Sequence, residues 1–259
     1  MPQEFITIDN TRLEICWVGV KKSEKPDLVF LHEGLGCVEL WRDFPDALCR
    51  KLGRRGFIYS RAGYGKSDPC ELPRPATYMH HEAIDILPQL LDAAGINSAI
   101  LIGHSDGGSI ALIHAATSSG PRVKAMVTLA AHVFSEKAVE AAFLAALSAY
   151  RSGDLRQRLK KYHGDNVDCA FYGWHGAWSL PEFEHWNLEE FLPAIQVPSL
   201  VIQGADDEYG TLRQVDAIIE GIGANATAQI IPDCGHSPHL QKPDMTLDVV
   251  SDFIVQLQC

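Results

Sequence analysis

The chain has 259 residues, of which 46% are hydrophobic, and its formal net charge is −11 at pH 7. This length and apolar content suit one globular domain with a sizeable core, and the absence of any run of 18 apolar residues argues against a membrane span. Because the largest basic groups are the pairs Lys21-Lys22 and Arg54-Arg55, the acidic chain should repel phosphate backbones, which excludes nucleic acid and favours a small-molecule substrate.

The amino-terminal segment and the cysteines bear on the compartment. The segment MPQEFITIDN has neither the basic start nor the apolar run of a secretion signal, and MPQ is not a myristoylation site, so we expect a cytoplasmic protein. The seven cysteines are odd in number and never spaced as C-x-x-C, which predicts reduced thiols rather than a disulfide framework or a zinc site. The oligomeric state stays open between a monomer and a homodimer.

Short runs rich in Val and Ile alternate with helix-length segments, which predicts an α/β fold with a mostly parallel sheet and helices on both faces. An antiparallel hairpin is expected first, at residues 4 to 19. The strands expected after it are Leu28–Leu31, Gly56–Tyr59, Ala99–Ile102, Val123–Leu129, Leu200–Gln203 and Gln229–Ile231. Helices are expected near 41–53, 78–94, 106–118, 211–221 and 243–257, and Pro88 predicts a kink or a new helical start within the second of them.

The alternation stops between about Val133 and Phe191, where helical patterns and the aromatic-rich stretch CAFYGWHGAWSLPEFEHW replace strands. We expect a helical lid over residues 133–191, inserted into a core formed by residues 1–132 and 192–259. The aromatic residues of the lid should partly pack it onto the core and partly wall a substrate pocket. The expected pocket residues are Leu35, Phe171, Tyr172 and Trp174.

The segment GHSDGG, residues 103 to 108, carries the strongest chemical signal. It follows a predicted strand, precedes a predicted helix and has the Gly-x-Ser-x-Gly spacing of a nucleophile elbow, in which a sharp turn exposes the serine hydroxyl. Ser105 is therefore the expected nucleophile, and the backbone N–H of Asp106 is an expected oxyanion donor. A frame shifted by one residue would make Asp106 the nucleophile, but it would place His104 where the turn requires a small residue.

A serine needs a histidine base oriented by a carboxylate, and both should follow late strands, in the order serine, acid, histidine. The segment GADDEYG follows one such strand, and PDCGHSPH follows the other. We expect His236 to be the base and His239, one turn further on, to be a helix-start or surface residue. The H-x-x-H spacing of these two histidines has no further ligand cluster, so no metal and no cofactor are expected.

These motifs resemble the α/β-hydrolase fold family, and the resemblance covers nearly the whole chain. Its segments are LHEGLG, LWRDFP, YSRAGYGKSD and GHSDGG, as found in lid-bearing bacterial hydrolases. The resemblance implies that the acid is Asp207, three residues after Gly204, rather than Asp206, which would shape the turn. It also implies that Gly34 donates the second oxyanion N–H.

Glu33 departs from the family pattern, which usually has a glycine at this position. A carboxylate pointing at a developing oxyanion would raise the barrier, so Glu33 should be turned away or paired. Arg61 is the partner expected, and a solvated Glu33 at a loop edge is the alternative.

The combined residues predict acyl transfer from a small to medium apolar or aromatic ester or lactone to water. A hydrolase of C–C bonds in aromatic ring-cleavage products is the alternative, and it would need a cationic clamp for a substrate carboxylate. The lid offers a basic run for this purpose, although a solvated helix face explains the run equally well: Arg151, Arg156, Arg158, Lys160 and Lys161. A cofactor-free dioxygenase and a non-catalytic receptor on the same fold are further alternatives.

Overall fold

The computed structural model describes residues 4–137 and 140–257, and the MPQ segment and Cys259 lie outside these ranges. Eight strands form one sheet in the order β1-β2-β4-β3-β5-β6-β7-β8. Their bounds are Glu4–Ile8, Thr11–Gly19, Asp27–Leu31, Arg55–Tyr59, Ala99–His104, Val123–Leu129, Ser199–Gly204 and Ala226–Ile231 for β1 to β8. Only the β1–β2 and β2–β4 pairings are antiparallel, which confirms the predicted hairpin and the mostly parallel sheet.

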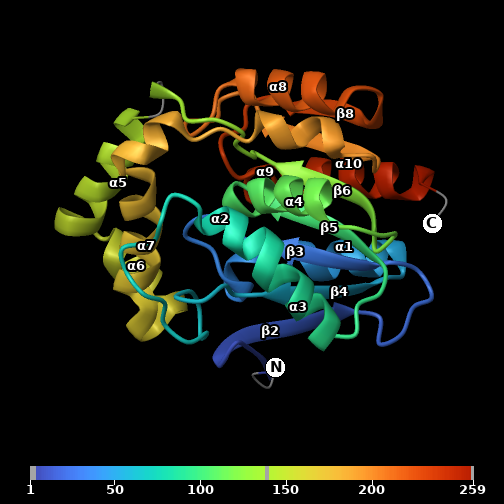
Figure 1. The fold of residues 1–259 in the computed structure, drawn as a ribbon, viewed down its shortest axis with the longest axis horizontal. Coiled ribbons are helices and arrows are strands. Elements are labelled where there is room, and N and C mark those ends of the chain that lie inside the picture. The colour runs from blue at the N-terminus through green and yellow to red at the C-terminus, as the bar shows by residue number, and fades with distance from the viewer. Residues whose placement is uncertain (1–3, 138–139, 258–259) are drawn as a thin grey trace.

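Helices cover both faces of this sheet (Figure 1). The helices of the body are α1 (Phe44–Leu52), α2 (Tyr78–His81), α3 (Leu87–Ala93), α4 (Asp106–Thr117), α8 (Leu212–Ile222), α9 (Pro238–Gln241) and α10 (Pro243–Gln256). Leu48 of α1 and Val250 of α10 belong to the apolar cluster on one face, whereas Leu90, Ile110 and Ile218 of α3, α4 and α8 belong to the cluster on the other. The strands therefore lie between two apolar layers, as their hydrophobic runs predict.

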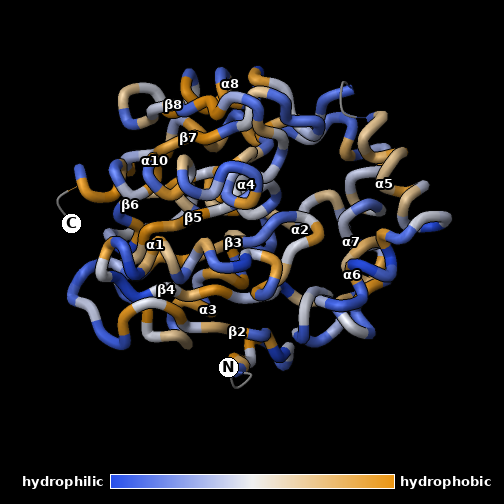
Figure 2. Tube along the Cα trace, turned by 180° about the vertical axis from the view of Figure 1, so that it is seen from behind, coloured by the Kyte–Doolittle hydropathy of each residue, from blue (hydrophilic) through white to orange (hydrophobic). Residues whose placement is uncertain are grey.

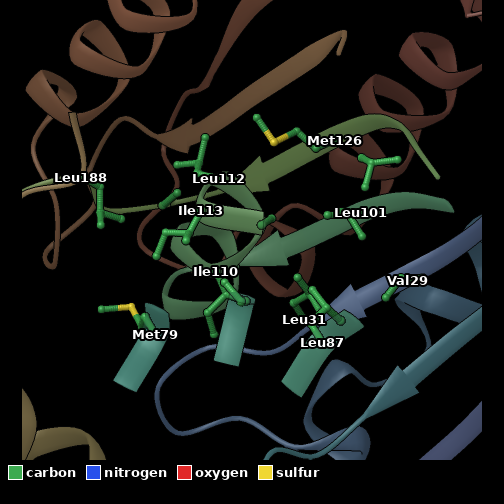
Figure 3. Close-up of a cluster of buried hydrophobic side chains, with 14 of the residues drawn as sticks. Val29, Leu31, Met79, Leu87, Leu101, Ile110, Leu112, Ile113, Met126 and Leu188 are labelled. Atoms are coloured by element: carbon green, nitrogen blue, oxygen red, sulfur yellow. The ribbon is translucent and has the colours of Figure 1, made fainter. Parts of the chain in front are cut away.

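The strands at the centre of the sheet are hydrophobic along most of their length, as the orange tube in Figure 2 shows. Figure 3 shows side chains of β3, β5 and β6 gathered around α4, with Leu31, Leu101 and Met126 among them. Leu101 and Ile110 have no exposed surface. Burial of side chains of this size contributes about 1.5–3 kcal/mol each, so α4 is held firmly against the strands that precede and follow it.

Pro88 marks a new helical start, one of the two outcomes that its position predicts. A π-helical segment, Glu82–Ile86, joins α2 to α3, and Pro88 occupies the first turn of α3. Proline is tolerated in a first turn because its missing N–H would have no intrahelical acceptor there.

Three helices stand beside the body at one end in both views, α5 (Glu140–Ser152), α6 (Leu155–His163) and α7 (Val167–Trp178) (Figures 1 and 2). They share an apolar cluster that includes Tyr150, Leu159 and Phe171. Short 3-10 segments are also found among the described residues: Val38–Trp41, Gly164–Asn166, Pro181–His185, Glu189–Ala194 and Gly223–Asn225. The helices α5, α6 and α7 lie within the predicted lid segment, and the lid boundaries at 133 and 191 stay a prediction.

Candidate active site

Ser105 lies at a tight turn between β5 and α4, with φ 52° and ψ −118°. This backbone conformation is strained for a residue with a side chain. The turn also leaves no room at its flanking glycines, because a Cβ on Gly103 would lie 2.2 Å from the Gly107 carbonyl oxygen and one on Gly107 would lie 1.9 Å from the Leu31 carbonyl oxygen. The spacing of small residues in GHSDGG is therefore a steric requirement of this turn.

Asp207 and His236 form a hydrogen-bonded pair across the ends of β7 and β8. The distances from His236 Nδ1 to the two carboxylate oxygens of Asp207 are 2.8 and 3.0 Å. Burial alone would raise the pKa of Asp207, but the hydrogen bond and charge of His236 outweigh it, so the pKa is lowered. An ionised Asp207 accepts the Nδ1 proton, which leaves Nε2 of His236 as the basic nitrogen.

The neighbours of this pair are arranged partly as predicted. Asp206 is exposed, and its backbone N–H donates to the Cys234 carbonyl oxygen at 2.8 Å, so it shapes the turn. Of the two alternatives predicted for His239, the helix start is confirmed, because the residue lies in the first turn of α9. The surface location is wrong, because His239 is buried and packs its ring 4.9 Å from that of Trp41. The apolar contacts of α9 draw it under the site rather than to the surface.

A cavity of about 170 Å³ is lined by five of the predicted site residues, Gly34, Leu35, Ser105, Trp174 and His236. Ser105 and His236 line it together with Glu33, Gly34 and Leu35 from the loop after β3. The strands β3, β5, β7 and β8 are parallel and their carboxyl ends meet at one edge of the sheet, which is why residues so far apart in sequence share one cavity.

Of the three lid aromatics predicted for the pocket, only Trp174 lines the cavity. Phe171 is wholly buried and stacks on Tyr150 with ring centroids 3.6 Å apart. Tyr172 is 38% exposed and lies outside the lining. Successive residues of α7 point about 100° apart, so Phe171 packs α7 onto α5 and Tyr172 faces solvent while Trp174 reaches the cavity.

Sequence reasoning missed four residues that line the cavity: His132, Phe143, Trp178 and Tyr209. His132 follows β6, and its position after a strand could have identified it. Its ring lies 5.6 Å from that of His236, and burial together with the charge of His236 lowers its pKa to about 3. His132 is therefore a neutral wall of the cavity at neutral pH.

The carboxylate of Asp106 is directed away from the cavity. Its side chain is fully buried, accepts a hydrogen bond from Tyr78 Oη and lies 3.8 Å from Arg61 Nη2. Burial raises the pKa of Asp106 against the opposing effect of Arg61. The backbone N–H of Asp106 is the first of α4, where helical N–H groups have no intrahelical acceptor. The side chain therefore braces the elbow, and only the backbone of Asp106 is suited to bind an oxyanion.

The loop after β3 is shaped by Arg61 in a way that differs from the prediction. Arg61 donates from Nη1 to the His32 carbonyl oxygen at 2.5 Å and from Nη2 to the Glu33 carbonyl oxygen at 2.9 Å. The predicted pairing with the Glu33 carboxylate was wrong, because that carboxylate faces His104 instead, 3.5 Å from Nδ1. A Cβ on Gly34 would lie 2.1 Å from Trp174 Cδ1, so only glycine fits beneath the indole ring.

The described residues offer neither a metal centre nor a cationic clamp. No group of three His, Cys, Asp or Glu residues within 4–137 and 140–257 could hold a metal ion. Arg156 pairs with Asp168 and Arg158 with Asp154 on exposed faces, and none of the basic residues in the predicted run lines the cavity. Within the same ranges, no helix has the length and apolar character needed to cross a membrane.

Comparison with known proteins finds similarity to enzymes with different names and activities. A family model described as the alpha/beta hydrolase family matches residues 28–249. The chain is 22% identical over 278 residues to a proline iminopeptidase of Lactobacillus delbrueckii subsp. bulgaricus, covering 93% of each. It is 26% identical over 228 residues to the 2-hydroxy-6-oxo-6-phenylhexa-2,4-dienoate hydrolase of Comamonas testosteroni, covering 79% of this chain and 78% of that one. The crystal structure of the enol-lactonase from Burkholderia xenovorans LB400 superposes with a TM-score of 0.72 at 22% identity, covering 97% of this chain and 100% of the other.

Proposed function

The chain belongs to the α/β hydrolase family, and from that premise we propose that it is a serine hydrolase of small apolar or aromatic esters or lactones. The observation that supports this most is the shared cavity: Ser105, at the strained turn, and His236, paired with Asp207, line the same space. A nucleophile, a base and a group that orients the base are the three parts that acyl transfer through serine requires.

The proposed reaction has two halves. His236 Nε2 takes the proton of Ser105 Oγ as this oxygen attacks the ester carbonyl, and the N–H groups of Gly34 and Asp106 stabilise the oxyanion. The tetrahedral intermediate expels the alcohol, which receives the proton from His236. His236 then takes a proton from water as the water attacks the acyl-enzyme. The bond between Ser105 Oγ and the acyl carbon breaks, the acid leaves, and His236 returns the proton to Ser105 Oγ. Asp207 holds the His236 tautomer and stabilises the imidazolium in both halves.

The size and charge of the cavity support a neutral, compact acyl group. Its volume of about 170 Å³ is close to that of engineered apolar cavities of about 150 Å³, which hold a single benzene ring. Phe143, Trp174, Trp178 and Tyr209 supply apolar walls. Among the described residues, those that line the cavity include one glutamate, Glu33, and no Lys or Arg. A carboxylate on the substrate would therefore find no cationic partner in the cavity. This disfavours a dienoate substrate and with it the C–C hydrolase alternative.

The test is labelling of the protein with a fluorophosphonate, followed by hydrolysis of nitrophenyl esters of increasing acyl length. We expect stoichiometric labelling at Ser105 and kcat/KM highest for short acyl or benzoyl esters. Absence of labelling would contradict the serine mechanism. A single turnover with retained product would instead indicate a receptor, and oxygen consumption with a heteroaromatic substrate would indicate a dioxygenase.

Replacement of Trp174 by alanine should change substrate preference and, because the indole is buried, also lower stability. Removal of the indole, which lies over Gly34 in the cavity wall, enlarges the acyl space. We expect kcat/KM for hexanoyl and octanoyl esters to rise about tenfold relative to the acetyl ester, within the range that one or two methylenes contribute in an apolar pocket. The measurement is the chain-length profile of the variant beside that of the unaltered protein.

Phe171→Ala is the matched control for this variant, three residues away on the same helix. Phe171 is buried against Tyr150 and lies outside the cavity lining, so its loss should lower the free energy of unfolding by about 3–5 kcal/mol. Its chain-length profile should keep the shape seen for the unaltered protein. A Trp174→Ala profile of the same shape would show that α7 does not set acyl specificity.

A further inference from the structure

Three catalytic loops meet at the buried side chain of His104. Glu33, from the loop after β3, places Oε2 3.5 Å from His104 Nδ1. On the other side of the ring, His104 Nε2 lies 2.8 Å from the backbone carbonyl oxygen of His236. His104 itself immediately precedes Ser105. One imidazole therefore connects the loop of the oxyanion donor Gly34, the nucleophile elbow and the loop of the base.

The position of the protons follows from the chemistry of these contacts. A carbonyl oxygen can only accept, so His104 Nε2 must carry a proton and donate it to His236. In a neutral ring Nδ1 would then present its lone pair to the Glu33 carboxylate, and the two would repel each other. The contact is attractive only when the pair holds one more proton, with an imidazolium facing a carboxylate.

The other histidines near Glu33 are neutral, so they do not pair with its carboxylate. Burial would raise the pKa of Glu33, but the hydrogen bond and charge of His104 reverse the effect and hold it well below the usual range. The ring of His239 lies 4.8 Å from that of His104, and burial lowers the pKa of His239 well below its normal value. Burial lowers the pKa of His32 in the same way. Both are therefore neutral and do not compete for Glu33.

The other charged groups nearby have partners of their own. Arg61 donates to the carbonyl oxygens of His32 and Glu33 and lies beside the Asp106 carboxylate. Asp207 is bonded to Nδ1 of the His236 ring, which lies 5.2 Å from the His104 ring. Among the described residues, Glu33 is thus the carboxylate that faces His104.

We propose that Glu33 is a positioning residue, which holds a doubly protonated His104 so that His104 fixes the backbone of His236 relative to Ser105. The inference rests on the proposed serine hydrolysis and deepens it. It also accounts for a glutamate beside the oxyanion site, because His104 balances the negative charge of Glu33.

The test compares Glu33→Gln with Glu33→Ala. A glutamine amide donates to Nδ1 of a neutral His104, so Glu33→Gln should keep kcat within about threefold of the unaltered protein. Glu33→Ala removes the carboxylate that faces Nδ1 and should lower kcat about tenfold with little change in KM. The size of this loss follows from histidines that bind metals, where loss of the group that orients the ring typically costs about 10- to 100-fold. Glu39→Gln, an exposed glutamate that pairs with Lys66, is the control and should leave kcat unchanged.

The split between kcat and KM, together with rescue by glutamine, separates positioning from simple packing. A packing role would lower the melting temperature of both Glu33 variants and leave the kcat values of the two folded variants alike. Glu33→Gln as impaired as Glu33→Ala would overturn the proposal.

A second readout does not depend on hydrolysis. In ¹⁵N spectra of histidine-labelled protein at neutral pH, one ring should show both nitrogens protonated, and in Glu33→Gln that ring should show a single protonated nitrogen. If this change appears in a protein that hydrolyses no ester, the serine hydrolase proposal fails while the ion pair stands. If the spectra of the two proteins are alike, the ion pair is refuted whatever the activity.

Discussion

Replacement of Ser105 by alanine is expected to lower kcat for ester hydrolysis by about 10⁴ to 10⁶, the loss typical when a triad nucleophile is removed. The change removes one oxygen atom from the wall of the cavity and leaves the Cβ in place. Because alanine has the same backbone restrictions as serine at φ 52°, the turn keeps its strain and the melting temperature should not move.

The measurement is kcat for a short nitrophenyl ester, with circular dichroism and thermal unfolding as checks on the fold. Ser119→Ala is the matched control, since Ser119 is exposed beyond the far end of α4 and should keep full activity. A Ser105→Ala protein that retained a tenth of the original rate would refute Ser105 as the nucleophile. In that case Asp106 would not become the nucleophile by default, because its carboxylate is buried behind the elbow.

Motifs that encode a backbone geometry could be read from the sequence. In GHSDGG, the small residues on either side of Ser105 are required by contacts of about 2 Å that any Cβ would make, so the spacing itself specifies the turn. The strands were predictable for a similar reason. β5 is buried along its whole length and β6 at every position except Lys124, so both read as largely apolar runs. The predicted bounds of β6 agree with those observed.

Features that depend on packing between distant segments could not be read in this way. Trp174 and Phe171 are both aromatic and lie on the same helix, and only the tertiary packing of α7 against Gly34 and Tyr150 decides which of them reaches the cavity. The partner of Glu33 was predicted wrongly for the same reason. Arg61 is near, but it contacts the Glu33 backbone, and the carboxylate turns to His104 across the sheet edge.

Asp207→Asn is expected to lower kcat by about 10⁴, as loss of the orienting carboxylate does in serine hydrolases of this type. An asparagine amide presents a donor to His236 Nδ1, which favours the tautomer with the proton on Nε2. That tautomer cannot accept the Ser105 proton. The imidazolium would also lose the opposing charge that now lies 2.8 Å from Nδ1.

Stability should change in the same variant with a defined pH dependence. Burial opposes ionisation of Asp207, but its contacts with His236 lower its pKa below that of the unfolded chain. A depressed carboxyl pKa stabilises the folded protein above the unfolded pKa of about 3.9, and this contribution disappears as the pH falls through the folded value. The melting temperature of Asp207→Asn should therefore lie below that of the unaltered protein at pH 7, and the gap should narrow in acid.

Asp206→Asn is the control that makes the assignment of Asp207 decisive. Asp206 is adjacent in sequence and identical in chemistry, but its side chain is exposed and its structural contact is a backbone N–H to Cys234, which asparagine retains. We expect this variant to keep kcat within about twofold, because exposed substitutions away from a site rarely change stability by more than about 0.5 kcal/mol. Rates for both variants, measured with the same ester at pH 7, give the ranking. Equal losses of kcat, or a larger loss in Asp206→Asn, would contradict the assignment of Asp207 as the carboxylate that orients His236.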